Sequence, residues 1–174
     1  MKESLRARRE QRYAVKRRLL RETAREHGLR VLIETGTYMG EIAWALRRDF
    51  DRIETVELEP TLVRLAEIRF RRTKNVRVHE GDSATVLLQI LATLDVPALF
   101  WLDAHPSTDR TARGGPIPLR SEIAAIAAHG VGGHVVLVDD LQYMGQAGYP
   151  SRDELRLPGH RFEEIDGVGR LSPG

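Results

Sequence analysis

Apolar residues occur along this chain in short runs that alternate with segments of helical periodicity. Runs rich in Val, Ile and Leu predict strands over residues 30–34, 52–57, 75–79, 98–103 and 134–139. Amphipathic patterns predict helices over residues 3–27, 41–48, 60–72, 83–93 and 119–129. Because strands and helices alternate from residue 30 onward, the pattern predicts a parallel sheet covered by helices on both faces.

The end of the chain is less regular, with turn residues recurring from Gly145 to Gly159. Residues 160–171 favour a final hairpin around the Asp166–Gly167 pair. The whole pattern predicts a doubly wound, mostly parallel α/β sheet of about seven strands with a C-terminal antiparallel hairpin. It divides the chain into a helical N-terminal extension, residues 1–28, and a domain over residues 29–174.

Composition narrows the class of protein. The 174 residues, 41% of them hydrophobic, are enough for one compact domain. The sequence contains no cysteine, which excludes disulfides, thiol catalysis and thiolate metal sites. No apolar run approaches the roughly 20 residues that span a bilayer, and the N-terminus lacks the hydrophobic segment of a secretory signal. We therefore expect a soluble, cytoplasmic protein without a membrane partner.

Charge is distributed unevenly between the predicted extension and the rest of the chain. Residues 1–30 carry 11 Lys or Arg against four Asp or Glu, whereas the remainder carries 16 against 21. Clustered cations attract the phosphates of nucleic acids, and this reading favours RNA or another anion as a partner. The alternative is an Arg-rich helix that packs its apolar stripe on the domain or on a second copy, forming a homodimer.

The segment VLIETGTYMGEIAWAL, residues 31–46, passes from a strand through a glycine-containing turn into a helix. Such a turn brings backbone N–H groups close to a ligand and is typical of a cofactor site, although a purely structural turn is the alternative. The spacing of Gly36 and Gly40 does not give the G-x-G-x-x-G of dinucleotide-binding folds. Glu34 would repel a pyrophosphate but attract an ammonium and a sulfonium, which favours S-adenosylmethionine over a nicotinamide dinucleotide.

An acidic residue stands at the end of every predicted strand of the parallel sheet, where ligands bind in such sheets. One such acid can simply cap the next helix, but repetition at five ends favours a site. Glu57 follows Gly40 at a distance suited to binding both ribose hydroxyls of an adenosine; a surface acid is the alternative. The set comprises Glu34, Glu57, Asp82 beside Ser83, Asp103, Asp139 and Asp140.

These motifs resemble those of class I S-adenosylmethionine-dependent methyltransferases. The resemblance is to the metal-dependent small-molecule O-methyltransferases, the group of catechol O-methyltransferase and the macrocin-type antibiotic-sugar enzymes. It covers about residues 30–141 and rests on ETGTYMG, TVELEP, EGDS, FWLDAH and VLVDDL. It implies a Rossmann-like fold, a methyltransferase domain over residues 29–174, and transfer of a methyl group to a hydroxyl of a small diol- or catechol-like acceptor.

The resemblance also implies roles for individual residues. It implies that cofactor is bound by Glu34, Gly36, Thr37, Tyr38, Gly40, Glu57, Asp82 and Ser83, and that Mg²⁺ or another divalent cation is bound by Asp103, Asp139 and Asp140. Three carboxylates at one sheet edge would raise one another's pKa unless a cation lay between them. Asp139 and Asp140 can share a site only if the strand ends there. The alternative is that one caps a helix and the other bonds to loop backbone.

The proton acceptor is the weakest part of this pattern. Catechol-type enzymes have a lysine three positions beyond the first metal aspartate, and Pro106 stands there in this chain. His105 is the nearest substitute, so we predict His105 and Asp103 as catalytic residues, with a hydrogen-bonding loop histidine as the alternative. We interpret His129 and His134 as structural, and we expect Trp44 and Trp101 in the core.

Two other functions use the basic N-terminal helix. One is an RNA-binding methyltransferase or adaptor whose helix binds phosphates. The other is a non-catalytic, cofactor-binding partner protein in which this helix and the long polar connection over residues 104–118 serve an interface. Small-molecule methyl transfer is the reading we favour, because it accounts for the strand-end acids.

Overall fold

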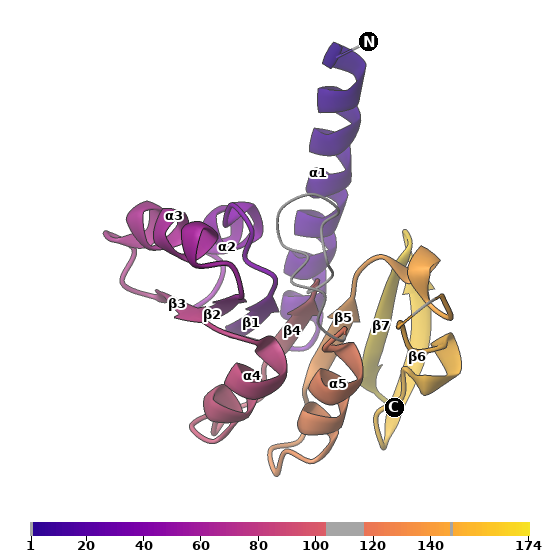
Figure 1. The fold of residues 1–174 in the computed structure, drawn as a ribbon. Helices are drawn as coiled ribbons and strands as arrows, with labels where there is room; N and C mark the ends of the chain where they lie inside the picture. Colours follow the sequence, from indigo (N-terminus) through magenta and orange to yellow (C-terminus); the bar gives the residue numbers. More distant parts are fainter. Residues whose placement is uncertain (1, 104–116, 147) are drawn as a thin grey trace.

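One seven-stranded sheet organises the protein, as the computed structural model of residues 2–103, 117–146 and 148–174 shows (Figure 1). Its strand order is β3-β2-β1-β4-β5-β7-β6. Five strands are parallel and the last two form a hairpin that joins β5 in antiparallel register. The strands are β1 (Val31–Thr35), β2 (Arg52–Glu57), β3 (Val76–Glu80), β4 (Leu99–Leu102), β5 (Val135–Val138), β6 (His160–Ile165) and β7 (Val168–Pro173). The predicted doubly wound, Rossmann-like sheet with a C-terminal hairpin is confirmed.

Five α-helices of the described residues cover the two faces of the sheet (Figure 1). One face carries α1 (Lys2–Glu26), α2 (Glu41–Leu46) and α3 (Pro60–Phe70), and the other carries α4 (Ser83–Leu91) and α5 (Leu119–Ala127). Two 3₁₀ turns that the sequence pattern did not predict follow β5, η1 (Leu141–Tyr143) and η2 (Arg152–Glu154). Within these ranges no helix has the length and apolar character needed to cross a membrane.

Alternate residues of the central strands face opposite layers, and this alternation positions the site. Phe100 and Val136 pack towards α4 and α5, while Trp101 and Leu137 pack towards α1 and α2. Because both faces are buried, these strands read in the sequence as continuous apolar runs. By the same alternation, residues 103 and 139, the first beyond β4 and β5, fall on the side of α1.

The two tryptophans have different environments. Trp101 is fully buried, as predicted. The prediction was wrong for Trp44, which is 39% exposed. Helix α2 buries Ile42, Ala43 and Leu46, which leaves position 44 on the outer side, where the Arg47 guanidinium lies 3.8 Å from the indole ring.

The second half of α1 packs in the same core as the sheet. Leu19, Leu20 and Ala24 are buried in a cluster with residues of β1, β4 and β5. Arg21 adds an ion pair to Asp49 at 2.8 Å, which ties α1 to the end of α2. The first half of α1 extends beyond the edge of the sheet (Figure 1).

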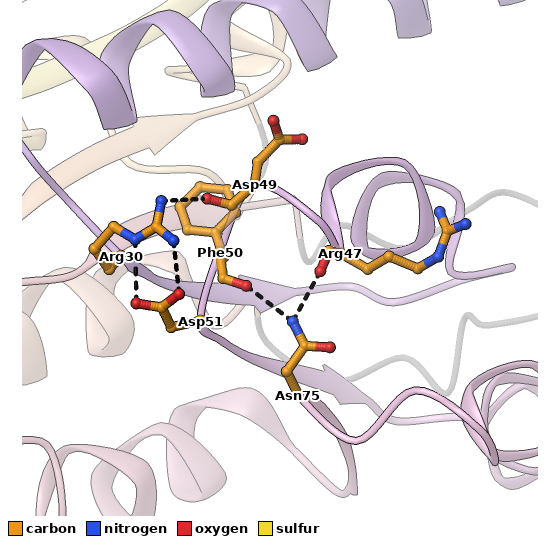
Figure 2. Close-up of polar contacts among 6 residues, drawn as sticks. All are labelled: Arg30, Arg47, Asp49, Phe50, Asp51 and Asn75. Atoms are coloured by element: carbon orange, nitrogen blue, oxygen red, sulfur yellow. Dashed lines mark hydrogen bonds and ion pairs between the residues drawn. The ribbon is translucent and has the colours of Figure 1, made fainter.

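The amino end of the sheet is fixed by polar contacts around the connection from α2 to β2. Figure 2 shows the Asn75 amide donating to the carbonyls of Arg47 and Phe50, at 2.8 and 2.9 Å. Arg30 binds the Asp51 carboxylate there at 2.6 Å. These contacts hold the starts of three adjacent parallel strands, while the conspicuous acids gather at the opposite end.

Candidate functional site

The order in which the chain connects the strands reverses between β1 and β4. From β1 the chain continues outward to β2 and β3, whereas from β4 it continues in the opposite direction to β5. In open α/β sheets, ligands bind at such a switch point beyond the carboxyl ends of the strands. Two sets of polar groups lie at this end. One surrounds the loop from β1 to α2, and the other follows β4 and β5.

The loop from β1 to α2 is held against the end of β2. The N–H groups of Gly36 and Thr37 both donate to the carbonyl of Val56, at 2.9 and 3.1 Å. The loop reverses through left-handed conformations, with φ of 86° at Gly36 and 48° at Tyr38. Tyr38, whose side chain points outward and is 43% exposed, therefore occupies a conformation that is uncommon outside glycine.

Gly40 closes this loop and begins α2. Its φ is 68°, and a Cβ atom added to it would lie 2.9 Å from the Phe70 ring. The close approach of α3 and the positive φ both require glycine at this position. The predicted loop-to-helix turn is thus present, and Gly40 is required there by its backbone conformation and by the Phe70 side chain.

Glu57 lies where the sequence analysis placed it, at the end of β2, and it already has two partners. Its carboxylate accepts hydrogen bonds from the backbone N–H of Tyr38 at 2.7 Å and of Glu59 at 3.0 Å. The residue is 6% exposed. Glu57 therefore clamps the glycine loop to β2, a role that the sequence analysis did not foresee, in addition to the predicted ribose contact.

Glu34 is buried within the sheet beside this loop. Its carboxyl accepts a hydrogen bond from the Thr55 hydroxyl at 2.6 Å, and Thr55 in turn contacts the Thr37 hydroxyl at 2.6 Å. Burial raises the pKa of Glu34 to about 8, and the nearby charges of Asp103 and Glu57 act in the same direction. A cation bound beside Glu34 would stabilise its ionised form.

Asp82 and Ser83 stand at the start of α4. Asp82 caps the helix by accepting from the N–H of Ala84 at 3.0 Å, and Ser83 is buried near Glu122. The cap explains an acid at this position without a ligand. Contact of these two residues with an adenine stays a prediction.

Asp103, Asp139 and Asp140 come together beyond β4 and β5. Each offers a carboxylate oxygen, and these oxygens lie within 4.8 Å of one another. Strand β5 ends at Val138, and Asp140 turns the chain with a φ of 54°, so two consecutive aspartates face one place. The condition that the sequence analysis set for a shared site is met. We call these three residues the acidic cluster.

The electrostatics of the acidic cluster follow from its burial and from α1. Burial raises the pKa of Asp139 to about 7, and the charge of Asp103 adds to this effect. Lys16 acts in the opposite direction, because its Nζ donates to Asp139 Oδ2. Arg12 lies 3.4 Å from Asp140, whose carboxylate also accepts from the Gln142 amide at 2.7 Å.

Lys16 is a residue of the site that the sequence pattern did not reveal. Its ammonium lies 5.6 Å from the centre of the Trp101 ring, on the face of the sheet to which Asp139 belongs. The pattern showed only a basic helix. The register of that helix against the sheet places this one lysine on the acidic cluster.

The predicted histidines lie in different parts of the chain. His105, the predicted proton acceptor, lies outside the described residues, whereas Asp103 directly follows β4 and donates its N–H to the Thr35 carbonyl at 3.1 Å. His129 and His134 contact each other at 2.8 Å at the amino end of β5. Burial lowers the pKa of His134 to about 4, and its Nδ1 accepts from the Ala98 N–H, in agreement with a structural role.

A small pocket next to the acidic cluster is also lined by Glu122 and Tyr149. Glu122 is 1% exposed, and burial raises its pKa to about 7, opposed by the hydroxyls of Ser83 and Thr35. Glu122 was not among the residues predicted for the site, although it shares a helical face with Leu119 and Ile126. An acid at such spacing on an apolar face is the signal that could have found it.

We expect Glu122→Gln to stabilise the protein above pH 7. A raised pKa in the folded state means that folding favours the protonated form, so this contribution is full below pH 4.5 and is lost as pH rises through about 7. The glutamine variant lacks the ionisation and should gain up to about 3 kcal/mol at pH 8 but little at pH 5. Urea denaturation at both pH values measures this, with exposed Glu67→Gln as the control. An equal change at both pH values would contradict the assignment.

The strand order and the helices on both faces give this chain the fold of solved S-adenosylmethionine-dependent methyltransferases. Among solved structures, the chain is similar to an O-methyltransferase from Bacillus cereus in complex with S-adenosylhomocysteine. The TM-score is 0.66 with 16% identity over 91% of this chain and 80% of that one. It is also similar to TomG, an O-methyltransferase from Streptomyces achromogenes involved in tomaymycin synthesis, with a TM-score of 0.63 and 22% identity over 92% of this chain and 81% of TomG.

The same fold occurs in enzymes with different acceptors. The chain is similar to the 23S rRNA methyltransferase ErmE, with a TM-score of 0.60 and 14% identity over 90% of this chain and 68% of that one. No protein-family model matches the sequence, and a search of curated proteins finds no relative. At these identities the likeness establishes the fold, and the acceptor must be argued from the site.

Proposed function

We propose that the protein is an S-adenosylmethionine-dependent methyltransferase that methylates a hydroxyl of a small acceptor with two neighbouring oxygens, with the help of a divalent cation. The observation that carries this proposal is the meeting of Asp103, Asp139 and Asp140 within 4.8 Å at the switch point of the fold. Strand β4 ends directly before Asp103 and pairs with β1, which leads into the glycine loop. The binding sites for the methyl donor and for the methyl acceptor would thus lie next to each other.

The choice of methyl donor is supported by the charges around the glycine loop. Glu34 and Glu57 bring two carboxyl groups to a loop that offers no basic side chain for a pyrophosphate. Burial raises the pKa of Glu34 to about 8, and an ammonium or sulfonium beside it would favour its ionised form. S-adenosylmethionine carries both cations, as well as the ribose hydroxyls that suit Glu57.

The acidic cluster has the chemistry of a site for a hard cation. Its donors are carboxylate oxygens, and the chain has no cysteine to favour a softer metal. Asp103, Asp139 and Asp140 would hold Mg²⁺, with Mn²⁺ or Ca²⁺ as alternatives. When bound, such a cation would lower the pKa of an acceptor hydroxyl and leave positions open for its two oxygens.

The chain's own residues would then position the acceptor and keep water away. Tyr149 and Met144 line the pocket beside the cluster, and Tyr143 stacks on Tyr149 with ring centres 5.7 Å apart. An aromatic and aliphatic wall of this kind suits a flat or small apolar body that carries two oxygens. Methyl transfer from a sulfonium needs mainly a correct line of approach, so positioning of the two reactants would supply much of the rate. His105 remains the proposed proton acceptor.

Activity of the unmodified protein with and without a chelator tests the metal requirement. We expect methylation of catechol, used as a probe diol, to need added MgCl₂ and to fall to background in excess EDTA. Calorimetry should show S-adenosylmethionine binding under both conditions, because the glycine loop does not use the metal. Full activity in EDTA would overturn the metal assignment, and failure to bind the cofactor would overturn the methyltransferase itself.

The RNA-binding alternative is disfavoured by the partners of α1. Several of its described cationic side chains lie within ion-pair distance of carboxylates of this chain, namely Arg12, Lys16, Arg17, Arg18 and Arg21. Cations that are engaged in this way are less available to phosphates. RNA retention with a steep salt dependence, lost on deleting residues 1–27, would restore this alternative. Cofactor binding without any metal effect would favour the RNA-binding or the adaptor alternative.

A further inference from the structure

The structure shows that α1 delivers a positive charge to the place where the proposed function puts a metal. Lys16 Nζ donates to Asp139 Oδ2, and the two side chains are 15% and 4% exposed. Asp139 is one of the three residues whose carboxylate oxygens lie within 4.8 Å of one another. A divalent cation held by all three would therefore lie close to an ammonium already bound to one of them, and the two positive charges would repel each other.

We propose that Lys16 is a tethered competitor for the divalent cation: its ammonium neutralises Asp139 in the metal-free protein and must leave Asp139 when the cation binds. This inference rests on the proposed function, because it concerns the affinity of the same site. It assigns to α1 a function in the site beyond covering the sheet. The affinity for the cation then depends on how strongly the Lys16 ammonium competes with it for the Asp139 carboxylate.

The position of Lys16 is fixed by the packing of the helix around it. The next turn of α1 is anchored by Leu19 and Leu20 in the core and by the Arg21–Asp49 ion pair. The ammonium is thus held near Asp139 at a high effective concentration, unlike a cation from solvent. Its side chain is long and partly exposed, so it can leave the carboxylate by changing rotamers while the helix stays in place.

Arg12 is a weaker second cation on the cluster. It lies 3.4 Å from Asp140, its side chain is 66% exposed, and an exposed pair of this kind is strongly screened by water. Lys16, in contrast, contacts the buried Asp139 carboxylate in a partly buried setting, where charges interact more strongly than at the surface. Removing Lys16 would take one positive charge away from Asp139, and a divalent cation would bind the acidic cluster more tightly.

The test measures binding of Mn²⁺ alone to the full-length protein, by calorimetry and by the electron paramagnetic resonance signal of free Mn²⁺. We expect Lys16→Met to bind Mn²⁺ at least about tenfold more tightly than the unmodified chain, since one competing charge is gone. Lys16→Arg, which keeps the charge, should bind no more tightly than the unmodified chain. Arg18→Met is the matched control, because it removes a cation of the same helix that pairs with distant Asp166; it should change the affinity less than about twofold.

A second measurement keeps the test valid if Lys16→Met folds less stably because Asp139 has lost its lysine partner: the melting temperature is recorded with and without Mn²⁺. The rise in melting temperature on adding Mn²⁺ should be larger for Lys16→Met than for the unmodified chain. The double variant Lys16→Met/Asp139→Asn should lose the gain in affinity. Equal or weaker Mn²⁺ binding by Lys16→Met overturns the competitor role alone. Absence of Mn²⁺ binding in every variant overturns it together with the metal part of the proposed function, while cofactor binding still tests the remainder.

Discussion

Asp139→Asn is expected to reduce metal-dependent methyl transfer by roughly a thousandfold or more, the effect of losing a cation that activates the acceptor hydroxyl. Asparagine keeps the shape of the side chain but replaces an anionic oxygen with a neutral amide that binds hard cations poorly. Asp139 is 6% exposed and lies in the acidic cluster, so water has little room to replace the lost ligand. Initial rates with catechol, S-adenosylmethionine and a series of MgCl₂ concentrations measure this loss.

The control for this variant is Asp153→Asn. The Asp153 side chain is 93% exposed and lies outside the acidic cluster. The rate of methyl transfer by Asp153→Asn should therefore remain close to that of the unmodified chain. Calorimetric affinity for S-adenosylmethionine should be similar for both variants, because the glycine loop is built on β1 and β2. An Asp139→Asn variant that retains the full rate and its response to MgCl₂ would show that no cation acts through this residue.

Glu57→Gln is expected to weaken cofactor binding by about a hundredfold, from the loss of charge-assisted hydrogen bonds worth about 1.5–3 kcal/mol each. The carboxylate accepts from the N–H groups of Tyr38 and Glu59. A glutamine offers one acceptor oxygen, and its NH₂ group would meet one of these N–H donors head on. The variant should therefore lose both the clamp on the glycine loop and the proposed contact with the ribose. Calorimetric titration with S-adenosylhomocysteine measures the change.

Glu80→Gln is the matched control for this variant. Glu80 pairs in register with Glu57 on the neighbouring strand β3, but its side chain is exposed. The affinity of Glu80→Gln for S-adenosylhomocysteine should be within about twofold of that of the unmodified chain, as expected for a substitution away from the ligand. If Glu57→Gln binds as tightly as Glu80→Gln, the adenosyl group does not lie at the end of β2. Melting temperatures of both variants separate loss of binding from loss of folding.

The sequence by itself determined the order of the elements and the sheet to which they belong. Apolar runs and helical periodicity are local signals, and each strand of the parallel sheet begins and ends within one residue of its predicted range. The acids at the strand ends were also visible, because parallel strands must bring their carboxyl ends to one edge. Trp44 was misplaced because residue type suggested burial, while the short α2 turns position 44 outward.

Only the tertiary structure decided which of those groups meet and what they meet. The left-handed turn at Asp140 brings two consecutive aspartates to one place, and no periodicity rule predicts a single residue's φ. Lys16 reaches Asp139 across 123 positions of the chain because Leu19 and Leu20 fix the register of α1 on the sheet. Residue type and spacing specify local structure, whereas contacts between distant segments depend on how complete elements pack against one another.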